Sequence, residues 1–199
     1  MSHELLTGKK GIVFGALDER SIAWKTALAC VAEGAEIILT NAPIAMRMGK
    51  INELAKLCNC PVIPADATSV ADIENLFQKS MEHFNGKVDF VLHSIGMSPN
   101  VRKNILYTNT NYDNFLKTLD ISALSFHRVL QTAMKLDALN EWGSVVALSY
   151  IAAQRAFPGY NDMADAKAMM ESIARSFGYS YGFAKQVRVN TISQSPTVT

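Results

Sequence analysis

Cysteine is scarce in this sequence, and the scarcity argues against a fold held together by disulfides. The 199 residues include only three cysteines, an odd and sparse set that is typical of reduced thiols. Cys58 and Cys60 stand close together. No second pair of cysteines or histidines follows them at metal-ligand spacing, so we expect no metal site.

Long apolar runs and one-sided charge are missing as well. No stretch of about 18 apolar residues occurs, so we expect no membrane span. The 19 basic and 18 acidic side chains are scattered and leave a net charge of +1, which gives no field to attract nucleic acid. The first ten residues, MSHELLTGKK, lack the apolar core of a signal peptide, and we expect a cytoplasmic protein.

What the sequence does contain is a regular alternation of two kinds of apolar segment. Hydrophobic residues make up 49% of the chain, enough for the core of one domain. We expect strands at residues 11–15, 36–40, 61–65, 88–95, 143–149 and 187–192, and helices at 21–33, 46–57, 69–84, 112–137 and 160–183. This order predicts one α/β domain over residues 1–199, a doubly wound parallel sheet of the Rossmann type with strand order 3-2-1-4-5-6.

Ligands of such sheets bind outside the carboxyl ends of the strands, where the strand order reverses. The first turn there lacks a G-x-G-x-x-G motif, since Gly15 is followed by Arg20-Ser21-Ile22 without a glycine at the helix start. A pyrophosphate can still meet the free N–H groups of that helix start. Ser21 either adds its hydroxyl to this phosphate site or only caps the helix.

The segments after the second and third strands carry further polar residues. Thr40-Asn41-Ala42 has neither an acid for a ribose 2′-hydroxyl nor an adjacent arginine for a 2′-phosphate. Arg47 and Lys50 follow and either reach a phosphate or are solvated, so NADH is favoured and NADPH is not excluded. Asp66 either accepts the adenine amino group or caps the helix that begins near Ser69.

A tyrosine and a lysine mark the start of the last helix. Tyr160 and Lys167 are seven positions apart, about two turns, which places them on one helix face, and Tyr150 ends the preceding strand. Two phenols and an ammonium can stabilise an oxygen that gains negative charge. The alternative is that Tyr160 caps the helix and Lys167 is solvated. The apolar residues beside them recur at helical spacing: Met163, Ala166, Met170, Ile173 and Phe177.

Five segments carry a resemblance that covers the whole chain: FGALDERSIAW, ADATSV, HSIGMSPN, LSYIAAQRAFPGYNDMADAK and VRVNTISQSP. In these motifs the chain resembles the bacterial NADH-dependent enoyl-acyl-carrier-protein reductases, which belong to the extended short-chain dehydrogenase group. Relatives that reduce carbonyl groups carry a serine thirteen residues before the tyrosine, where this chain has Ala147. They also carry N-A-G where this chain has Ser94-Ile95-Gly96. Both differences favour enoyl reduction.

The resemblance implies roles for the residues named above. Tyr160 would hydrogen-bond and help to protonate the enolate, Lys167 would hold the nicotinamide ribose and lower the pKa of the phenol, and Tyr150 would contact the substrate. The cofactor would be lined by Gly15, Ser21, Ile22, Asp66, Ala67, Ser94, Ile95, Gly96, Lys167 and Ile192. His93 is expected to be a hydrogen-bonded core residue with no role in the chemistry.

The resemblance also implies the partners. The substrate would be an enoyl group on acyl carrier protein, and the long helices would form a homotetramer. Relatives continue beyond the last expected strand, so we expect this chain to be truncated or incomplete at its C-terminus. Two alternatives remain: a carbonyl reductase of the same group, and a dinucleotide-binding module without turnover.

Overall fold

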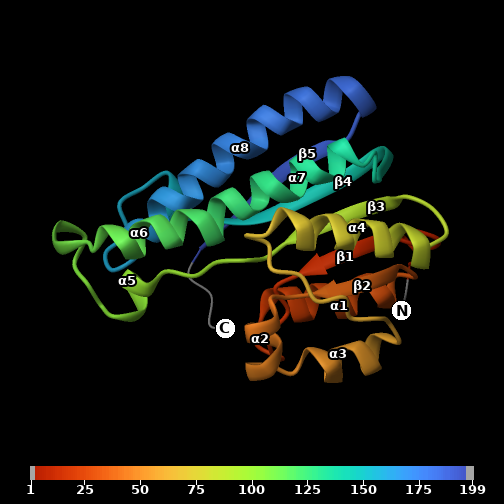
Figure 1. The fold of residues 1–199 in the computed structure, drawn as a ribbon, viewed down its shortest axis with the longest axis horizontal. Helices are drawn as coiled ribbons and strands as arrows, with labels where there is room; N and C mark the ends of the chain where they lie inside the picture. Colours follow the sequence, from red (N-terminus) through yellow and green to blue (C-terminus); the bar gives the residue numbers. More distant parts are fainter. Residues whose placement is uncertain (1–2, 196–199) are drawn as a thin grey trace.

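The computed structural model describes residues 3–195 and has a five-stranded, all-parallel sheet at its centre (Figure 1). The strands are β1 (Lys10–Phe14), β2 (Glu36–Thr40), β3 (Val88–His93), β4 (Leu139–Tyr150) and β5 (Arg188–Gln194). Their spatial order is β2-β1-β3-β4-β5, so the order reverses at β1 and the mouth between β1 and β3 is the switch point.

The helices connect consecutive strands and lie against the two faces of the sheet. They are α1 (Ile22–Ala32), α2 (Pro43–Met48), α3 (Ile51–Cys58), α4 (Val70–His83), α5 (Pro99–Arg102), α6 (Tyr112–Leu119), a π-helical turn η2 (Asp120–Leu124), α7 (Ser125–Lys135) and α8 (Asn161–Lys185). Two short 3₁₀ turns are η1 (Tyr107–Asn109) and η3 (Ile151–Ala153). The predicted α/β class and Rossmann type are confirmed.

Each face of the sheet has its own core. Because strand side chains alternate in direction, Ile12 and Phe14 face α4, α7 and α8, whereas Val13 faces α1 and α3. Figure 1 shows these two helix groups on opposite sides of the sheet. The apolar face predicted for the last helix is confirmed, since Met163, Ala166, Met170 and Ile173 are buried and Phe177 packs beside them.

The prediction of the third strand, at 61–65, is wrong for the residues that the structure describes. Only one parallel bridge, between Val62 and Leu39, forms there. Pro61 and Pro64 flank it, and proline has no N–H to extend a ladder. The bridge nevertheless runs beside β2, where the third strand was expected, and the order of the other five strands is confirmed.

Two predicted helices are interrupted. The helix expected at 46–57 is split into α2 and α3, because Gly49 is extended and the Lys50 N–H donates to the Leu17 carbonyl at 2.7 Å. The helix expected at 112–137 passes through the π-helical turn η2, where Ser122 turns its hydroxyl to the Met97 peptide group. Both interruptions are tertiary contacts with loops that end β1 and β3.

The sheet is covered unevenly at β5. Helices α1 and α3 cover β1 and β2 on their face, whereas Ile192 on β5 leaves 54% of its side chain exposed.

Within the part of the chain described, no helix has both the length and the apolar character needed to cross a bilayer.

Candidate functional site

The loops that end β1 and β3 touch at the switch point. Gly15 has a φ of +87°, and a methyl group there would lie 2.0 Å from the Ser94 carbonyl oxygen. Only glycine fits, because it tolerates positive φ and has no Cβ to meet this oxygen. The structure thus brings together two predicted cofactor residues, Gly15 and Ser94, in direct contact.

The first turn is held rigidly by its own side chains. Ser21 caps α1: its Oγ accepts from the Trp24 N–H and the Leu17 N–H, both at 3.3 Å, and donates to the Asp18 carbonyl at 2.8 Å. The Ser21 hydroxyl therefore caps α1, and its contact with a phosphate stays a prediction. Ile22 begins the helix, and the free N–H groups of that first turn remain suited to a phosphate.

Asn41 occupies the place after β2 where an acid is common. Its amide donates to the Ala16 carbonyl at 3.2 Å, and its oxygen accepts from the Ala42 N–H at 2.9 Å. This link between the first turn and β2 was not predicted. The Lys50 ammonium forms an ion pair with Glu19 at 2.9 Å. Lys50 would therefore have to leave Glu19 in order to bind a 2′-phosphate.

The residues after the Val62 bridge form a tight turn. The Asp66 carboxylate accepts from both the N–H and the hydroxyl of Thr68, at 2.9 and 2.8 Å. Ser69, not Asp66, caps α4 through the Asp72 N–H, so the alternative of Asp66 as the helix cap is wrong. Ala67 is buried beside it.

Lys167 is buried, contrary to the solvated alternative. Its side chain is 6% exposed, and its Nζ donates to the Leu148 carbonyl at 2.6 Å. A methyl group on Gly96 would lie 3.7 Å from the same Nζ, so the ammonium faces the loop that ends β3. Ile192 pairs with Leu148 in the parallel register and so lies on the neighbouring strand. Burial lowers the pKa of Lys167 to about 8.

Tyr150 and Tyr160 stack on each other. Their ring centroids are 4.3 Å apart at an interplanar angle of 28°, and Phe157 meets both rings edge-on. Tyr160 stands at the N-cap position of α8 but makes no capping bond with its side chain. Burial, reinforced by Tyr150, raises the pKa of Tyr160 to about 12.

This raised pKa is a correction to the sequence-based expectation that Lys167 acidifies the phenol. In the structure the effect of burial on Tyr160 dominates, and the Lys167 ammonium donates to a backbone carbonyl instead. Tyr160 therefore remains a neutral O–H donor at physiological pH.

The end of β4 is fastened to α8 by a residue that the sequence did not single out. Glu171 is buried, and its carboxylate accepts from the Ser149 hydroxyl at 2.7 Å and from the Gln154 amide at 3.1 Å. Because Ser149 precedes Tyr150, this contact fixes the strand end that carries the stacked phenol. Its four-residue spacing from Lys167 is the signal that could have identified it.

His93 is a core residue, as expected. Its Nε2 lies 2.9 Å from the Ser125 hydroxyl, and its ring lies between Phe14 and Phe126. Burial, and secondarily the Lys167 charge, lower the pKa of His93 to about 3, so the ring stays neutral. His93 is the last residue of β3 and is fully buried.

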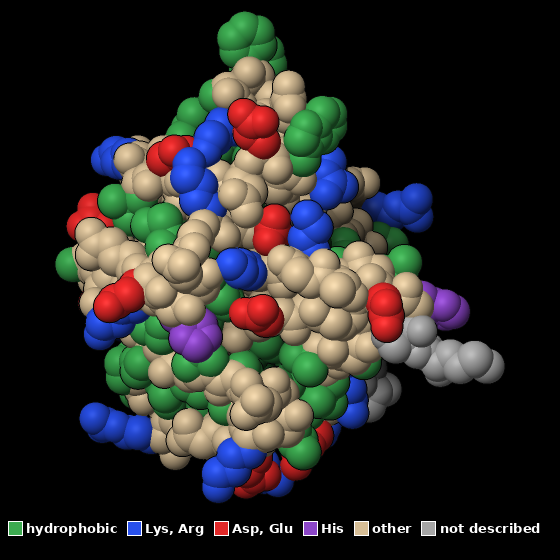
Figure 2. Space-filling view, turned by 90° about the vertical axis from the view of Figure 1, so that its right-hand side faces the viewer, with side chains coloured by type: hydrophobic (Ala, Val, Ile, Leu, Met, Phe, Trp, Pro, Cys, Tyr) green, Lys and Arg blue, Asp and Glu red, His purple; other side chains and the backbone are tan. Residues whose placement is uncertain are grey.

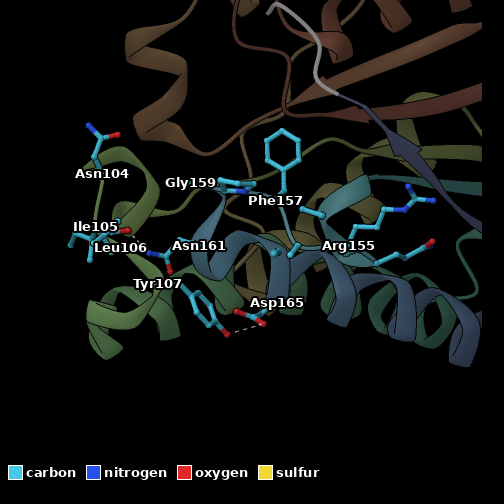
Figure 3. Close-up of a pocket in the computed structure, with 15 residues that line it drawn as sticks. Asn104, Ile105, Leu106, Tyr107, Arg155, Phe157, Gly159, Asn161 and Asp165 are labelled. Carbon is cyan, nitrogen blue, oxygen red and sulfur yellow. Dashed lines mark hydrogen bonds between the residues drawn. The ribbon is translucent and has the colours of Figure 1, made fainter.

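Beside the stacked tyrosines lies a cavity of about 850 Å³. Its lining is largely apolar and includes Ile105, Leu106, Phe157 and Pro158. Figure 3 shows Phe157 projecting from its loop, with Tyr107 and Asp165 joined by a hydrogen bond on the other side of α8's first turn. This cavity was not predictable from the sequence, because it combines two loops that are about fifty residues apart in sequence.

The cysteines form no candidate metal centre. All three are free thiols, and burial raises the pKa of the Cys60 thiol to about 12, which disfavours the thiolate that a metal needs. Over residues 3–195 no group of three or more His, Cys, Asp or Glu side chains is arranged to hold a metal ion.

Comparisons with known proteins agree on one family. The family described as Enoyl-(Acyl carrier protein) reductase matches residues 15–199. "Enoyl-[acyl-carrier-protein] reductase [NADH] 2" of Rhizobium meliloti is 34% identical over 96% of this chain and 70% of its own length. The crystal structure of the FabI-NADH complex from Alistipes finegoldii has a TM-score of 0.97 and 66% identity, covering 99% of this chain and 70% of that one. The crystal structure of the enoyl-[acyl-carrier-protein] reductase (NADH) from Aquifex aeolicus has a TM-score of 0.88 and 32% identity, covering 98% of this chain and 76% of that one.

Proposed function

This chain belongs to the enoyl-(acyl carrier protein) reductase family, and we infer that it reduces the trans-2 double bond of enoyl thioesters on acyl carrier protein, with NADH as the reductant. The observation that carries this inference is the placing of two features at the carboxyl end of β4: Tyr160 stacks on Tyr150 there, and the buried Lys167 ammonium contacts the Leu148 carbonyl and faces Gly96. The reaction completes a cycle of fatty-acid elongation.

The residues present suit a dinucleotide. Gly15 has no Cβ to meet the Ser94 carbonyl, and Gly96 has none to meet the Lys167 ammonium. The first N–H groups of α1 can bind a pyrophosphate. When bound, NADH would supply a hydride for the β-carbon of the enoyl group. We propose that Gly15, Ser21, Ile22, Asp66, Ala67, Ser94, Ile95, Gly96, Lys167 and Ile192 line it.

Tyr160 and Lys167 have different tasks in this proposal. Tyr160 keeps its proton, because its pKa is about 12, and donates a hydrogen bond to the thioester oxygen as it becomes an enolate oxygen. Lys167 would hold the ribose hydroxyls, since its Nζ faces the Gly96 loop. Tyr150 stacks on Tyr160 and limits the directions in which the phenol can point.

The apolar cavity next to the tyrosines is the place proposed for the acyl chain. Phe157 lines the cavity and also contacts Tyr150 and Tyr160. The acyl chain of the substrate would therefore extend from the reacting carbons into the cavity. Carbonyl reduction is less well supported, because Ala147 is fully buried in β4 and has no hydroxyl to offer a ketone.

A spectrophotometric assay tests the function. The protein should oxidise NADH in the presence of crotonyl thioester and leave acetoacetyl thioester unreduced. Oxidation with the ketone alone would instead support the carbonyl reductase. Thermal stabilisation by NADH without turnover of either thioester would support a binding module.

We propose further that the chain is a single dinucleotide-binding domain that assembles as a homotetramer in the cytoplasm. Tyr179 and Phe183 support the assembly: they lie one turn apart on α8 and are 79% and 89% exposed. The free thiols suit a reducing compartment.

A further inference from the structure

A carboxylate is buried where α8 begins. Asp162 is the second residue of that helix and is fully buried. Three donors surround it: Oδ1 accepts from the Ser98 hydroxyl at 2.5 Å, and Oδ2 accepts from the Asn100 amide at 2.7 Å and the Thr118 hydroxyl at 2.8 Å. Among the ion pairs that the described residues form, none involves Asp162, so hydrogen bonds and the positive end of the helix compensate its burial.

The three donors are themselves fixed and buried. Ser98 caps α5 by accepting from the Val101 N–H at 3.0 Å, and Asn100 also donates to the Asn111 carbonyl at 3.1 Å. Thr118 lies on α6. Asp162 therefore joins the start of α8 to the 98–118 segment at three points.

The neighbouring residue makes the same connection. Asn161 has a φ of +40°, a conformation that is strained for a residue with a side chain. Its oxygen accepts from the Thr110 hydroxyl at 2.9 Å and its amide donates to the Ile105 carbonyl at 2.5 Å. These contacts hold the strained residue in place, immediately after Tyr160.

The network also reaches the cofactor loop. Ser98 lies two residues after Gly96, so the carboxylate that holds α8 also holds this loop. On the other side of Ser98, the Met97 N–H donates to the Ser122 hydroxyl at 3.0 Å. The loop is thus fixed between the π-helical turn η2 and the first turn of α8.

From this geometry we propose that Asp162 is a positioning residue: it fixes the Tyr160 phenol relative to the Ser94–Gly96 loop by fastening the first turn of α8 to residues 98–118. The inference rests on the role proposed for Tyr160. It deepens the proposed function, because the distance between the phenol and the reacting carbonyl then depends on a carboxylate that touches neither substrate nor cofactor. A displacement of about 1 Å at such a donor reduces the rate by up to about a hundredfold.

The test begins with Asp162→Asn in the full protein. The amide keeps the shape but has one acceptor oxygen in place of two, so the three donors can no longer all be satisfied as they are by the carboxylate. At temperatures well below the variant's Tm, kcat with crotonyl thioester should fall about tenfold or more, while KM for NADH stays within about twofold. Asp113→Asn is the matched control, since it removes a carboxylate from an exposed position of α6, and it should match the wild type.

A double-mutant cycle separates positioning from a merely structural role. In a Tyr160→Phe background, Asp162→Asn should cause no further loss in kcat, because the hydroxyl that it positions is gone. The same fold-loss in both backgrounds, or an unchanged kcat in Asp162→Asn, would overturn the inference. Should Asp162→Asn fail to fold, Thr118→Val removes one donor at nearly constant shape, and the same two outcomes apply to it.

The two proposals fail in different ways. A wild-type protein that turns over no enoyl thioester would overturn the proposed function and this inference with it. An active wild type whose losses are additive in the cycle would overturn the inference alone.

Discussion

At the scale of single residues, the site depends on burying groups that would be more stable in water. Lys167 is enclosed at 6% exposure with one carbonyl acceptor, and Glu171 and Asp162 are buried on the same helix. Hydrogen bonds compensate the burial of each of these charged groups. Helix α8 therefore holds the side chains of the site in fixed positions, and burying its charged groups reduces the stability of the fold.

The stability cost of Lys167 can be measured through pH. Its pKa is lowered from 10.5 to about 8 in the folded protein, so the folded state binds fewer protons than the unfolded state between those values, and stability rises with pH across that window. Below about pH 8 the burial penalty is present in full, about 3 kcal/mol. Lys167→Met should therefore be more stable than the wild type at pH 7, and the difference should shrink toward pH 10.5.

Urea denaturation of both proteins at pH 7 and at about pH 10 gives this difference directly. Lys79→Met, on an exposed position of α4, should show no pH-dependent difference. A constant gap for Lys167→Met would mean that the lysine titrates alike in both states.

At the scale of elements, the candidate site is formed where the carboxyl ends of β1, β3 and β4 contact one another or the start of α8. The β1 and β3 loops touch through Gly15 and Ser94, β4 is joined to α8 through Glu171, and α8 is joined to α5 and α6 through Asp162. Each junction brings together segments that are distant in sequence, so each depends on the whole sheet being formed. The carboxyl ends of the strands and the start of α8 lie on the left of Figure 1.

The junction of β1 and β3 should be sensitive to one methyl group. Gly15→Ala adds a Cβ that meets the Ser94 carbonyl at 2.0 Å in a positive-φ conformation, so the β3 loop must move. NADH affinity, followed by fluorescence titration, should weaken by about tenfold or more, roughly 1.4 kcal/mol. Gly8→Ala is the control, because Gly8 has a φ of +74° but nothing within 4 Å. Equal NADH affinity in the two variants would show that the contact is unimportant.

At the scale of the whole molecule, one helix end has apolar side chains without a partner in the structure. Figure 2 looks at the molecule from the side where α8 ends, and apolar side chains protrude at its top among charges of both signs. Tyr179 and Phe183 are the large apolar residues exposed on this part of α8. Isolated exposed apolar residues are ordinary, but a pair on one helix face favours burial in an assembly.

Replacement of Phe183 tests the proposed assembly. Sedimentation should give a tetramer for the wild type and a smaller species for Phe183→Glu, because a buried unpaired carboxylate disfavours the interface. Leu57→Glu serves as the control, since Leu57 is 66% exposed on α3, on the opposite side of the sheet. A wild-type monomer, or a tetramer that survives the Phe183 change, would contradict the assembly through this helix.

Much of the fold was predictable because its signals are local. Alternating strand and helix periods gave five strands and their order, and the stripe from Met163 to Phe177 gave the buried face of α8. The strand expected at 61–65 was wrong because its prolines outweigh its apolar residues. The interruptions at Gly49 and Ser122 were missed because their causes, Leu17 and Met97, are far away in sequence.

The sequence by itself determined the fold class and the order of the five strands, and it predicted Tyr150, Tyr160 and Lys167 as candidate site residues, because periodicity and motif spacing can be read along the chain. Only the tertiary structure decided how those groups are held and titrate. Burial gives Lys167 a pKa of about 8 and Tyr160 a pKa of about 12, and Asp162 obtains its three donors from a segment more than forty residues away. Desolvation and long-range hydrogen bonds exist only after the chain has folded, and no local pattern encodes them.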